Sequence, residues 1–400
     1  MPITRIEDIN VKGRRLLIRA DLNAPVNNGK VTDATRITRF AEGLKPLLAK
    51  GARAIVLSHF GRPKGKRVPE MSLAPIAPAL SAALGQYVEF VNDCIGDAAV
   101  NAAAQLNDGQ AMLCENLRFH AGETANDPGF ARELAQLGDI YVNDAFSASH
   151  RAHASTSAIT GLLPACSGPL LDQEIKALTS ALETPKHPAV ALVGGAKVSS
   201  KIAVLKNLVN KLDAIIIGGG MANTFMFAEG QPIGKSLCER DQVETVHEIR
   251  SLARAANCEL VLPVDIVYAF EFAENVENHV AEIDGCPPDG MILDAGPKSI
   301  TRFNEVLAGA ETILWNGPLG AFEIRPFGKA TKRVAEKAAE LTRSGQVISV
   351  AGGGDTVAAL NMAGVAGDFT YVSGAGGAFL EWLEGKELPG LAALNRAKAA

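Results

Sequence analysis

The stretch "PAVALVGGAKVSSKI" (residues 188–202) joins a continuous apolar run to a glycine pair and then to a segment with two lysines. A run of Val, Ala and Leu without polar alternation is typical of a parallel strand that is buried on both faces. Glycines after such a strand let backbone N–H groups approach an anion, and a helix that begins there adds positive potential. The stretch therefore predicts a strand, a turn at Gly194-Gly195, and a helix that carries Lys197 and Lys201 on one face.

The same unit recurs along the chain. Apolar runs such as "RRLLIRAD" (14–21), "DAIIIGGG" (213–220) and "MILDAG" (291–296) alternate with segments of helical spacing such as "KATKRVAEKAAELTRSG" (329–345). This alternation predicts an α/β fold with two Rossmann-like domains, each a mainly parallel sheet with helices on both faces. The segment "LDQEIKALTSALETPKHP" (171–188) is the predicted hinge helix between them. The predicted division is an N-terminal domain 1–171, a hinge helix 172–187, a C-terminal domain 188–385 and a tail 386–400, which we expect to pack against the N-terminal domain.

Composition limits the class of protein. The chain has 400 residues, of which 47% are hydrophobic and 21% are charged, as expected for a folded protein of about two domains. Its start, "MPITRIEDIN", lacks the pattern of a signal peptide, and the sequence contains no apolar run long enough for a membrane span. Six scattered cysteines without a C-x-x-C pair indicate reduced thiols in a cytoplasmic protein, and argue against a disulfide frame or a zinc site.

Charge is distributed unevenly. Residues 1–170 carry a net charge of +2 and residues 171–400 a net charge of −7. Neither half has the basic, aromatic-interleaved surface of a nucleic-acid-binding protein. The first half is therefore the better candidate for binding a small acidic molecule.

Unusual polar residues follow the predicted strands of the first half. They are Asp21 and Asn23 in "RADLNAP", Arg36 in "VTDATR", His59 and Arg62 in "SHFGRPKG", Arg118 in "ENLRF" and Arg151 in "DAFSASHRAHAS". The carboxyl ends of parallel strands meet at one edge of a sheet, where ligands bind. Arginines gathered there would grip phosphate and carboxylate oxygens.

The second half places glycines at the corresponding positions. "IIIGGGMANTF", "ILWNGPLGAFE" and "SVAGGGDTVAA" each have the strand–glycine–helix form, and the last reaches Asp355-Thr356. Such loops together favour a polyphosphate with its metal. "GGGMAN" fails as a dinucleotide fingerprint because Asn223 stands where the third glycine belongs, which argues against a nicotinamide dehydrogenase. "AEGQPIGKS" (228–236) resembles Walker A by chance, since it follows a predicted helix, and we expect Lys235 to matter little.

Nine blocks, in one order along nearly the full chain, resemble the phosphoglycerate kinase family. They are "RADLNAP", "SHFGRP", "ENLRFHAGE", "NDAFSASHRAHAST", "GGAKVSSK", "GGGMANTF", "WNGPLGAFE", "GGGDT" and "LEGKELPG". The resemblance implies 3-phosphoglycerate on the N-terminal domain, MgATP or MgADP on the C-terminal domain, and a monomer. Two departures stand out: Ser147-Ala148-Ser149 replaces a common Gly-Thr-Ala, and Ala375 and Phe379 replace a glycine and a serine.

The resemblance also implies residue roles. Substrate binding falls to Asp21, Asn23, Arg36, His59, Phe60, Gly61, Arg62, Arg118 and Arg151. Nucleotide binding falls to Lys201, Glu323, Gly353, Gly354, Asp355 and Thr356, with Asp355 as the contact to Mg²⁺. Arg36 and Lys197 are the candidates for stabilising the transferred phosphoryl group.

The implied reaction is reversible phosphoryl transfer between 1,3-bisphosphoglycerate plus ADP and 3-phosphoglycerate plus ATP. The attacking carboxylate is already ionised, so no general base is needed, and catalysis rests on positioning and charge neutralisation. His59 is expected to position the substrate, and transfer requires closure about the hinge. Two alternatives share parts of this pattern: another two-domain carboxylate kinase that forms an acyl phosphate, and a non-catalytic anion-binding protein.

Overall fold

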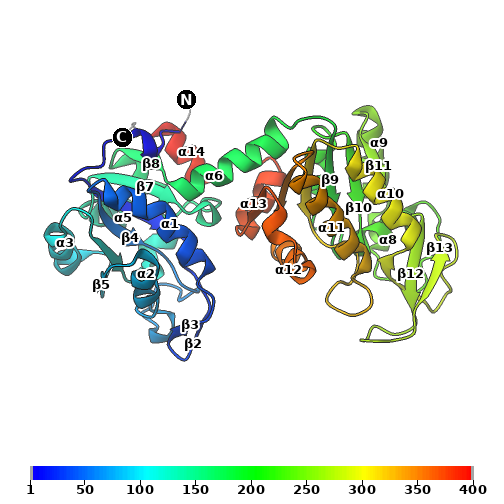
Figure 1. Cartoon of the computed structure of the whole chain (residues 1–400), viewed down its shortest axis with the longest axis horizontal. Coiled ribbons are helices and arrows are strands. Elements are labelled where there is room, and N and C mark those ends of the chain that lie inside the picture. The colour runs from blue at the N-terminus through cyan, green and yellow to red at the C-terminus, as the bar shows by residue number, and fades with distance from the viewer. Residues whose placement is uncertain (1–2, 398–400) are drawn as a thin grey trace. The chain divides into compact units, whose positions relative to one another are not determined.

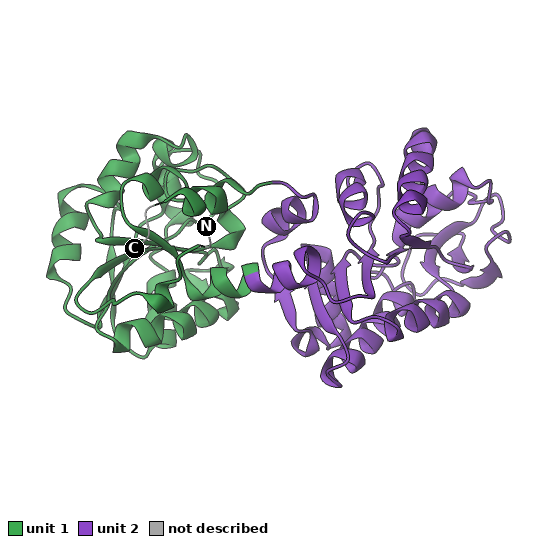
Figure 2. Ribbon diagram, turned by 90° about the horizontal axis from the view of Figure 1, so that it is seen from above, with its two compact units in different colours: residues 1–175, 387–400 green, residues 176–386 purple. Residues whose placement is uncertain are grey.

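The structure is a computed structural model that describes residues 3–397 (Figure 1). The chain forms two compact units, one of residues 1–175 with 387–400 and one of residues 176–386 (Figure 2). Residues 398–400 of the predicted tail and residues 1–2 of the predicted N-terminal domain lie outside the described residues. No helix among the described residues is long and apolar enough to cross a membrane.

Unit 1 is built on a six-stranded parallel sheet in the order β5-β6-β4-β1-β7-β8. Its strands are β1 (Arg15–Ala20), β4 (Arg53–Leu57), β5 (Val88–Val91), β6 (Ala111–Cys114), β7 (Ile140–Asp144) and β8 (Ala165–Ser167), and a small hairpin joins β2 (Val26–Asn27) to β3 (Lys30–Val31). Its helices are α1 (Thr35–Ala49), α2 (Ile76–Leu84), α3 (Gly96–Gln105), α4 (Ala121–Thr124), α5 (Pro128–Ala135) and α14 (Pro389–Arg396).

Strand β1 shows why this sheet is covered on both faces. Side chains alternate along a strand, and Leu16 and Ile18 join one core cluster with Phe40 of α1 and Leu80 of α2. Leu17 points to the opposite face and is also fully buried. An apolar run without polar alternation is thus the signature of a strand between two helical layers.

Unit 2 contains a second six-stranded parallel sheet, in the order β11-β10-β9-β15-β16-β17. Its strands are β9 (Ala189–Val193), β10 (Ala214–Ile217), β11 (Glu259–Val261), β15 (Thr312–Asn316), β16 (Ile348–Gly352) and β17 (Tyr371–Ser373). Its helices are α7 (Ile202–Leu208), α8 (Gly219–Ala228), α9 (Val243–Ala255), α10 (Pro297–Ala308), α11 (Lys329–Arg343), α12 (Gly354–Ala363) and α13 (Gly376–Leu383). The prediction of an α/β fold with two mainly parallel sheets flanked by helices is confirmed.

One predicted strand belongs elsewhere. "MILDAG" forms β14 (Met291–Ala295), which pairs antiparallel with β12 (Asp265–Ala269), itself paired with β13 (His279–Glu282). This separate three-stranded sheet packs Ile266 and Ile292 against Met226 of α8. Half-buried and exposed residues alternate along β13, whereas β14 has no exposed residue.

The first boundary between the units falls within α6 (Pro169–Leu178), which continues into a π-helical segment, Thr179–Glu183. Asp144, the last residue of β7, accepts hydrogen bonds from the backbone N–H groups of Leu170 and Leu171 and so caps the start of α6. At the other end of the chain, α14 packs in unit 1, where Gly390 donates its N–H to the carbonyl of Ser149.

Candidate active site

Four neighbouring strands of unit 1, β6, β4, β1 and β7, end at one edge of the sheet. Asp21 and Asn23 follow β1, His59 to Arg62 follow β4, Arg118 lies in the 3₁₀ helix Leu117–Phe119 after β6, and Arg151 follows β7. Arg36 lies in the first turn of α1. We call these residues the acceptor edge. The predicted convergence follows from the strand order, because parallel strands present their carboxyl ends on the same side.

Asp21 connects three parts of the acceptor edge. Its Oδ2 accepts hydrogen bonds from Nη1 of Arg36 at 2.8 Å and from Oγ of Ser147 at 2.6 Å, and its Oδ1 accepts one from the N–H of Asn23. Burial would raise the pKa of Asp21, but its neighbours, with the Arg36 guanidinium as the largest influence, hold that pKa below its ordinary value. Asp21 is therefore a carboxylate that orients Arg36.

Ser147 was not among the predicted site residues. The sequence marked it only as a departure from the family's common glycine at this position. The side chain that glycine lacks is the one that donates to Asp21. The departure thus adds a hydrogen bond to the acceptor edge.

His59 has a defined protonation state. Its Nδ1 lies 2.9 Å from Nη2 of Arg19, and because a guanidinium has only donors, Nδ1 must accept. Burial, then the charges of Arg19 and Arg118, lower the pKa of His59 well below its ordinary value. The ring is therefore neutral, with its proton on Nε2. Such a ring can position an anion as a hydrogen-bond donor, as expected from the sequence.

Arg19 is fully buried, and its role could not be read from its position in an apolar strand. Its Nε donates to Oγ of Ser155, which in turn donates to the buried carboxylate of Glu123 at 2.7 Å. Burial would raise the pKa of Glu123, but contacts with His153, Arg19 and Ser155 hold it below its ordinary value. A charge pair bridged by a hydroxyl thus fixes the guanidinium that sets the tautomer of His59. The one signal in the sequence was a charged residue inside the run "RRLLIRAD".

Backbone contacts order the rest of the acceptor edge. Arg118 donates from Nη1 to the carbonyl of Gly61 at 2.9 Å, and Asn23 accepts the N–H of Gly61 through Oδ1 at 3.3 Å. Phe60 is half-buried beside them, whereas Arg62, Arg151 and Arg36 are exposed. The edge therefore combines exposed guanidinium groups with hydrogen-bonded residues beneath them.

Unit 2 contains a cavity of about 500 Å³ next to the carboxyl ends of β9 and β10. Backbone and apolar groups make up most of its lining, which includes Gly195, Gly219, Gly220, Met226, Ile266, Phe272, Leu319 and Gly320. Glu323 and Asp355, two of the predicted nucleotide-binding residues, also line it. An apolar cavity with a few polar groups at its margin is typical of a small-molecule site.

The prediction that Lys197 and Lys201 lie on one face of a helix is wrong. Helix α7 begins only at Ile202, so Lys197 lies in the preceding loop and Lys201 is the residue before the helix. Ser199 holds this loop in place, because its N–H and hydroxyl both donate to the carboxylate of Glu239. The sequence could not reveal this contact, which comes from 40 residues further along the chain.

Lys201 instead turns back toward the ends of two strands. Its Nζ donates to the carbonyls of Gly194 at 2.6 Å and Asn316 at 2.8 Å. Burial lowers the pKa of Lys201 to about 8, against the opposing effect of Asp355. An ammonium group has three donors, so one remains for a ligand. Lys197 is exposed.

The loop Gly353 to Thr356 is shaped by its neighbours. Gly353 has a φ of +99°, and a Cβ there would meet Nδ2 of Asn316 at 2.7 Å, so only glycine fits. The hydroxyl of Thr356 accepts the N–H of Gly317 at 2.7 Å, which ties this loop to the loop after β15. Asp355 is exposed in the first turn of α12, and Gly354 precedes it. Gly353, Gly354 and Thr356 thus support the position of Asp355 rather than lining the cavity.

The departures at Ala375 and Phe379 lie beneath this loop. Both side chains are buried, and a Cβ at Gly352 would meet the ring of Phe379 at 2.7 Å. Phe379 therefore packs directly against the strand end that leads into Gly353. The contact beneath the loop is therefore an apolar ring, where the family usually has the hydroxyl of a serine.

The Walker-like loop follows helix α8, as expected, and no strand precedes it. Lys235, which we expected to matter little, is exposed but lines the cavity. Its N–H donates to the carbonyl of Gly290, and this contact anchors the loop beside β14. Contact between this loop and the distant strand β14 thus places Lys235 at the cavity, which the local motif could not predict.

An arginine-rich edge on one α/β unit and a glycine-lined cavity on a second are suited to an enzyme that binds two substrates on separate units. Comparison with known proteins identifies the family. The family model for phosphoglycerate kinase matches residues 6–386, and the chain belongs to this family.

Similar proteins agree with this assignment. The phosphoglycerate kinase of Ruegeria sp. (strain TM1040) is 57% identical, over 98% of both chains. That of Sinorhizobium fredii (strain NBRC 101917 / NGR234) is 56% identical over the full length of both. Among solved structures, phosphoglycerate kinase from Coxiella burnetii matches with a TM-score of 0.92 and 43% identity, over 99% of this chain and 100% of that one. The enzyme from Pyrococcus horikoshii OT3 matches with a TM-score of 0.82 and 29% identity, over 98% of both chains.

Proposed function

We propose that this protein catalyses reversible phosphoryl transfer between 1,3-bisphosphoglycerate plus ADP and 3-phosphoglycerate plus ATP, the glycolytic phosphoglycerate kinase reaction. The observation that carries the proposal is the pairing of an arginine-rich acceptor edge in unit 1 with a cavity bordered by Glu323 and Asp355 in unit 2. Relatives of 56–57% identity with this name support it, and they do not favour another carboxylate kinase or a non-catalytic anion-binding protein.

The acceptor edge suits 3-phosphoglycerate, which carries a phosphate and a carboxylate. Exposed Arg62 and Arg151 and half-buried Arg118 would bind the phosphate oxygens, since guanidinium groups bind such oxygens bidentately. Neutral His59 would donate from Nε2, and Asp21 and Asn23 would hold Arg36 and the Gly61 loop in register. The acceptor carboxylate needs no general base because it is already ionised.

The cavity suits ATP or ADP. Its apolar lining can hold a nucleoside, while Asp355 in its lining and Lys201, which is bonded to the carbonyl of Gly194 next to Gly195 of the lining, would bind the phosphates. Mg²⁺ is normally held by one or two carboxylates together with the substrate phosphates. The exposed oxygens of Asp355 beside the cavity fit that donor set. When bound, Mg²⁺ would neutralise phosphate charge, and Arg36 and Lys197 would stabilise the transferred phosphoryl group.

A coupled assay tests the proposal. ATP consumption should depend on added 3-phosphoglycerate and should not occur with acetate or glycerate as the acceptor. Consumption with another carboxylate, at a higher kcat/KM, would favour the alternative carboxylate kinase. No consumption with any acceptor, despite nucleotide binding, would favour an anion-binding protein.

Hinge bending is needed because the acceptor residues and the nucleotide residues belong to different units. Transfer requires reacting atoms about 3–3.5 Å apart, yet the acceptor residues belong to unit 1 and the nucleotide residues to unit 2. We therefore propose closure on binding of both ligands, with rotation absorbed where the chain passes between the units, in α6 and near residue 386. Small-angle scattering should show a smaller radius of gyration with 3-phosphoglycerate plus a non-hydrolysable MgATP analogue than with either alone. An unchanged radius in all ligand states would contradict closure.

A cytoplasmic location and a monomeric state remain predictions of the sequence. All six cysteines are free thiols in the structure. Size-exclusion chromatography with light scattering measures the oligomeric state, and a mass near 41.9 kDa would agree with a monomer.

A further inference from the structure

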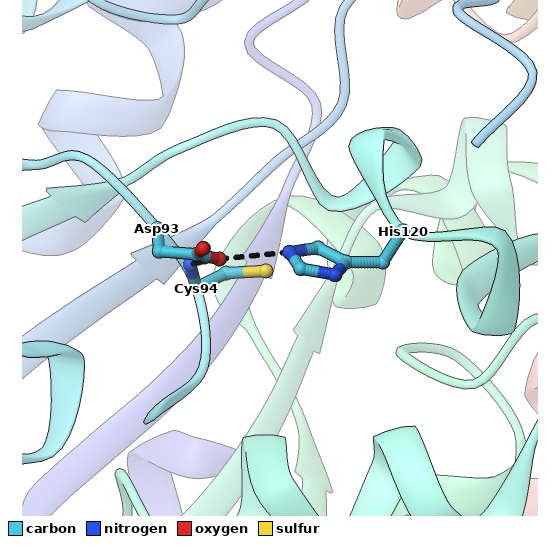
Figure 3. Close-up of side chains that lie close together, drawn as sticks. All are labelled: Asp93, Cys94 and His120. Atoms are coloured by element: carbon cyan, nitrogen blue, oxygen red, sulfur yellow. Dashed lines mark hydrogen bonds and ion pairs between the residues drawn. The ribbon is translucent and has the colours of Figure 1, made fainter. Parts of the chain in front are cut away.

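Three potential metal ligands meet beside the acceptor edge. Asp93 and Cys94 follow β5, and His120 follows the 3₁₀ helix after β6, the strand that pairs with β5. One ligand atom of each residue lies within 4.8 Å of the others (Figure 3). No other group of this kind occurs among residues 3–397. The cysteine spacing argued against a zinc site, but that argument covers only ligands that are close in sequence.

The arrangement differs from that of a catalytic triad. In a triad the imidazole lies between its partners and uses one nitrogen for each. Here Nε2 of His120 meets Oδ1 of Asp93 at 2.7 Å, and the Cys94 thiol points to the same edge of the ring (Figure 3). Three donors that converge on one point are suited to a shared cation.

We propose that Asp93, Cys94 and His120 bind a divalent transition metal of the Zn²⁺ class, with a fourth position open to water. Thiolate, imidazole and carboxylate are the ligands that Zn²⁺ uses, usually in a tetrahedron. Metal–ligand bonds of ~2.0–2.3 Å place the donors of a tetrahedron roughly 3.3–3.7 Å apart. Asp93 and His120, whose donor atoms are 2.7 Å apart, therefore have to separate slightly, and the metal replaces the proton between them.

The charges favour a cation. A bound metal deprotonates a coordinating thiol outright because its own charge dominates the site. A Cys94 thiolate and an Asp93 carboxylate would then balance Zn²⁺. The inference is independent of the proposed function.

Access and rigidity also fit. The side chains of His120 and Asp93 are 29% and 36% exposed, which leaves a path for the ion, while Cys94 is fully buried. The N–H of Cys94 donates to Asp93, and the ring of His120 stacks on Phe130 at 5.1 Å between centroids. The ligands are thus held by their surroundings on both loops.

Metal titration of the full chain, cleared of metal with a chelator and free of nucleotide, tests the site. We expect one Co²⁺ per chain, with the near-ultraviolet thiolate charge-transfer band, and displacement of that band by Zn²⁺. Zn²⁺ should also raise the unfolding temperature, because it binds only the folded state at this site. Cys94→Ser should abolish the band, and His120→Asn should weaken Co²⁺ binding more than roughly 10-fold.

Two matched controls separate this site from others. His187 forms a similar pair with Asp213, at 2.6 Å, but has no thiol in the group, so His187→Asn should leave the titration unchanged. Cys166→Ser removes another buried thiol of unit 1 and should also leave it unchanged. An absent band at millimolar Co²⁺, or a band that persists in Cys94→Ser, would overturn the proposal. If Cys94→Ser does not fold, His120→Asn decides, since equal affinity in that variant would also overturn it.

Discussion

The two units use the same edge of the same kind of sheet in different ways. In unit 1 the carboxyl ends of the strands carry polar and charged side chains, which are oriented by partners such as buried Arg19 and half-buried Asp21. In unit 2 they carry glycines, so that backbone and apolar groups line a cavity and only a few charges border it. A compact acceptor with a phosphate and a carboxylate can be bound by guanidinium groups, whereas a nucleotide needs both room and an apolar surface. We therefore expect single side chains to determine ligand binding in unit 1, and the geometry of the loops to determine it in unit 2.

The largest expected effect is at Arg36. Arg36→Ala should lower kcat by about 10²–10³-fold, because it removes a charge that stabilises the transferred group. The affinity for ATP should stay nearly unchanged, since Arg36 belongs to unit 1. Arg132→Ala, which alters an exposed arginine of α5, is the control and should leave kcat intact. Steady-state kinetics and calorimetry measure both quantities, and a near-normal kcat would refute the role of Arg36.

The buried carboxyl of Asp294 provides a pH-dependent test confined to unit 2. Burial raises its pKa to about 8, against hydrogen bonds from the N–H groups at the start of α11. A raised pKa means that the folded state binds a proton more tightly than the unfolded state. The stability due to this proton is therefore complete below pH ~4 and is lost as pH rises toward 8, by up to about 1.4 kcal/mol per pH unit.

Asp294→Asn should remove this part of the pH dependence. The two tryptophans, Trp315 and Trp382, both belong to unit 2, so their fluorescence during urea unfolding reports on that unit. The difference in unfolding free energy between the variant and the wild type should grow in favour of the variant from pH 5 to pH 8. A constant difference would mean that Asp294 is ionised throughout, held by its helix-capping contacts.

Two lysines of unit 2 test whether the loop after β9 or the Walker-like loop contributes more to ATP binding. Lys201→Ala should weaken ATP binding roughly tenfold or more, as loss of a charge-assisted hydrogen bond does. Lys235→Ala should weaken it up to about fivefold, because Lys235 is exposed at the cavity and solvent screens its charge. Lys206→Ala, at an exposed ion pair with Glu248, is the control. A larger effect at Lys235 than at Lys201, measured by calorimetry, would reverse the assignment.

The smallest expected effect is at Ser147. Ser147→Ala removes one hydrogen bond to Asp21 and should raise the KM for 3-phosphoglycerate about two- to tenfold, in line with the net value of a hydrogen bond. The KM for ATP should not change. Ser147→Gly restores the residue common in the family and should behave like the alanine variant. If the acceptor KM is unaltered in both, Ser147 is only a loop residue.

The sequence alone was enough to predict the fold class and most of the acceptor edge. Continuous apolar runs identify strands that are buried on both faces, and residues that directly follow parallel strands must share an edge. Asp21, His59 and Arg118 could therefore be grouped before any coordinates were known. Position relative to a strand end is local information, which the order of residues contains.

Tertiary structure decided whatever depends on partners far along the chain. Glu239 holds the loop in which Lys197 lies, Ser147 reaches Asp21 across 126 residues, and β14 brings Lys235 to the cavity. The meeting of Cys94 with His120 likewise depends on the pairing of β5 with β6. No local pattern encodes such contacts, because hydrogen bonds and packing between distant segments form only when the whole core is assembled.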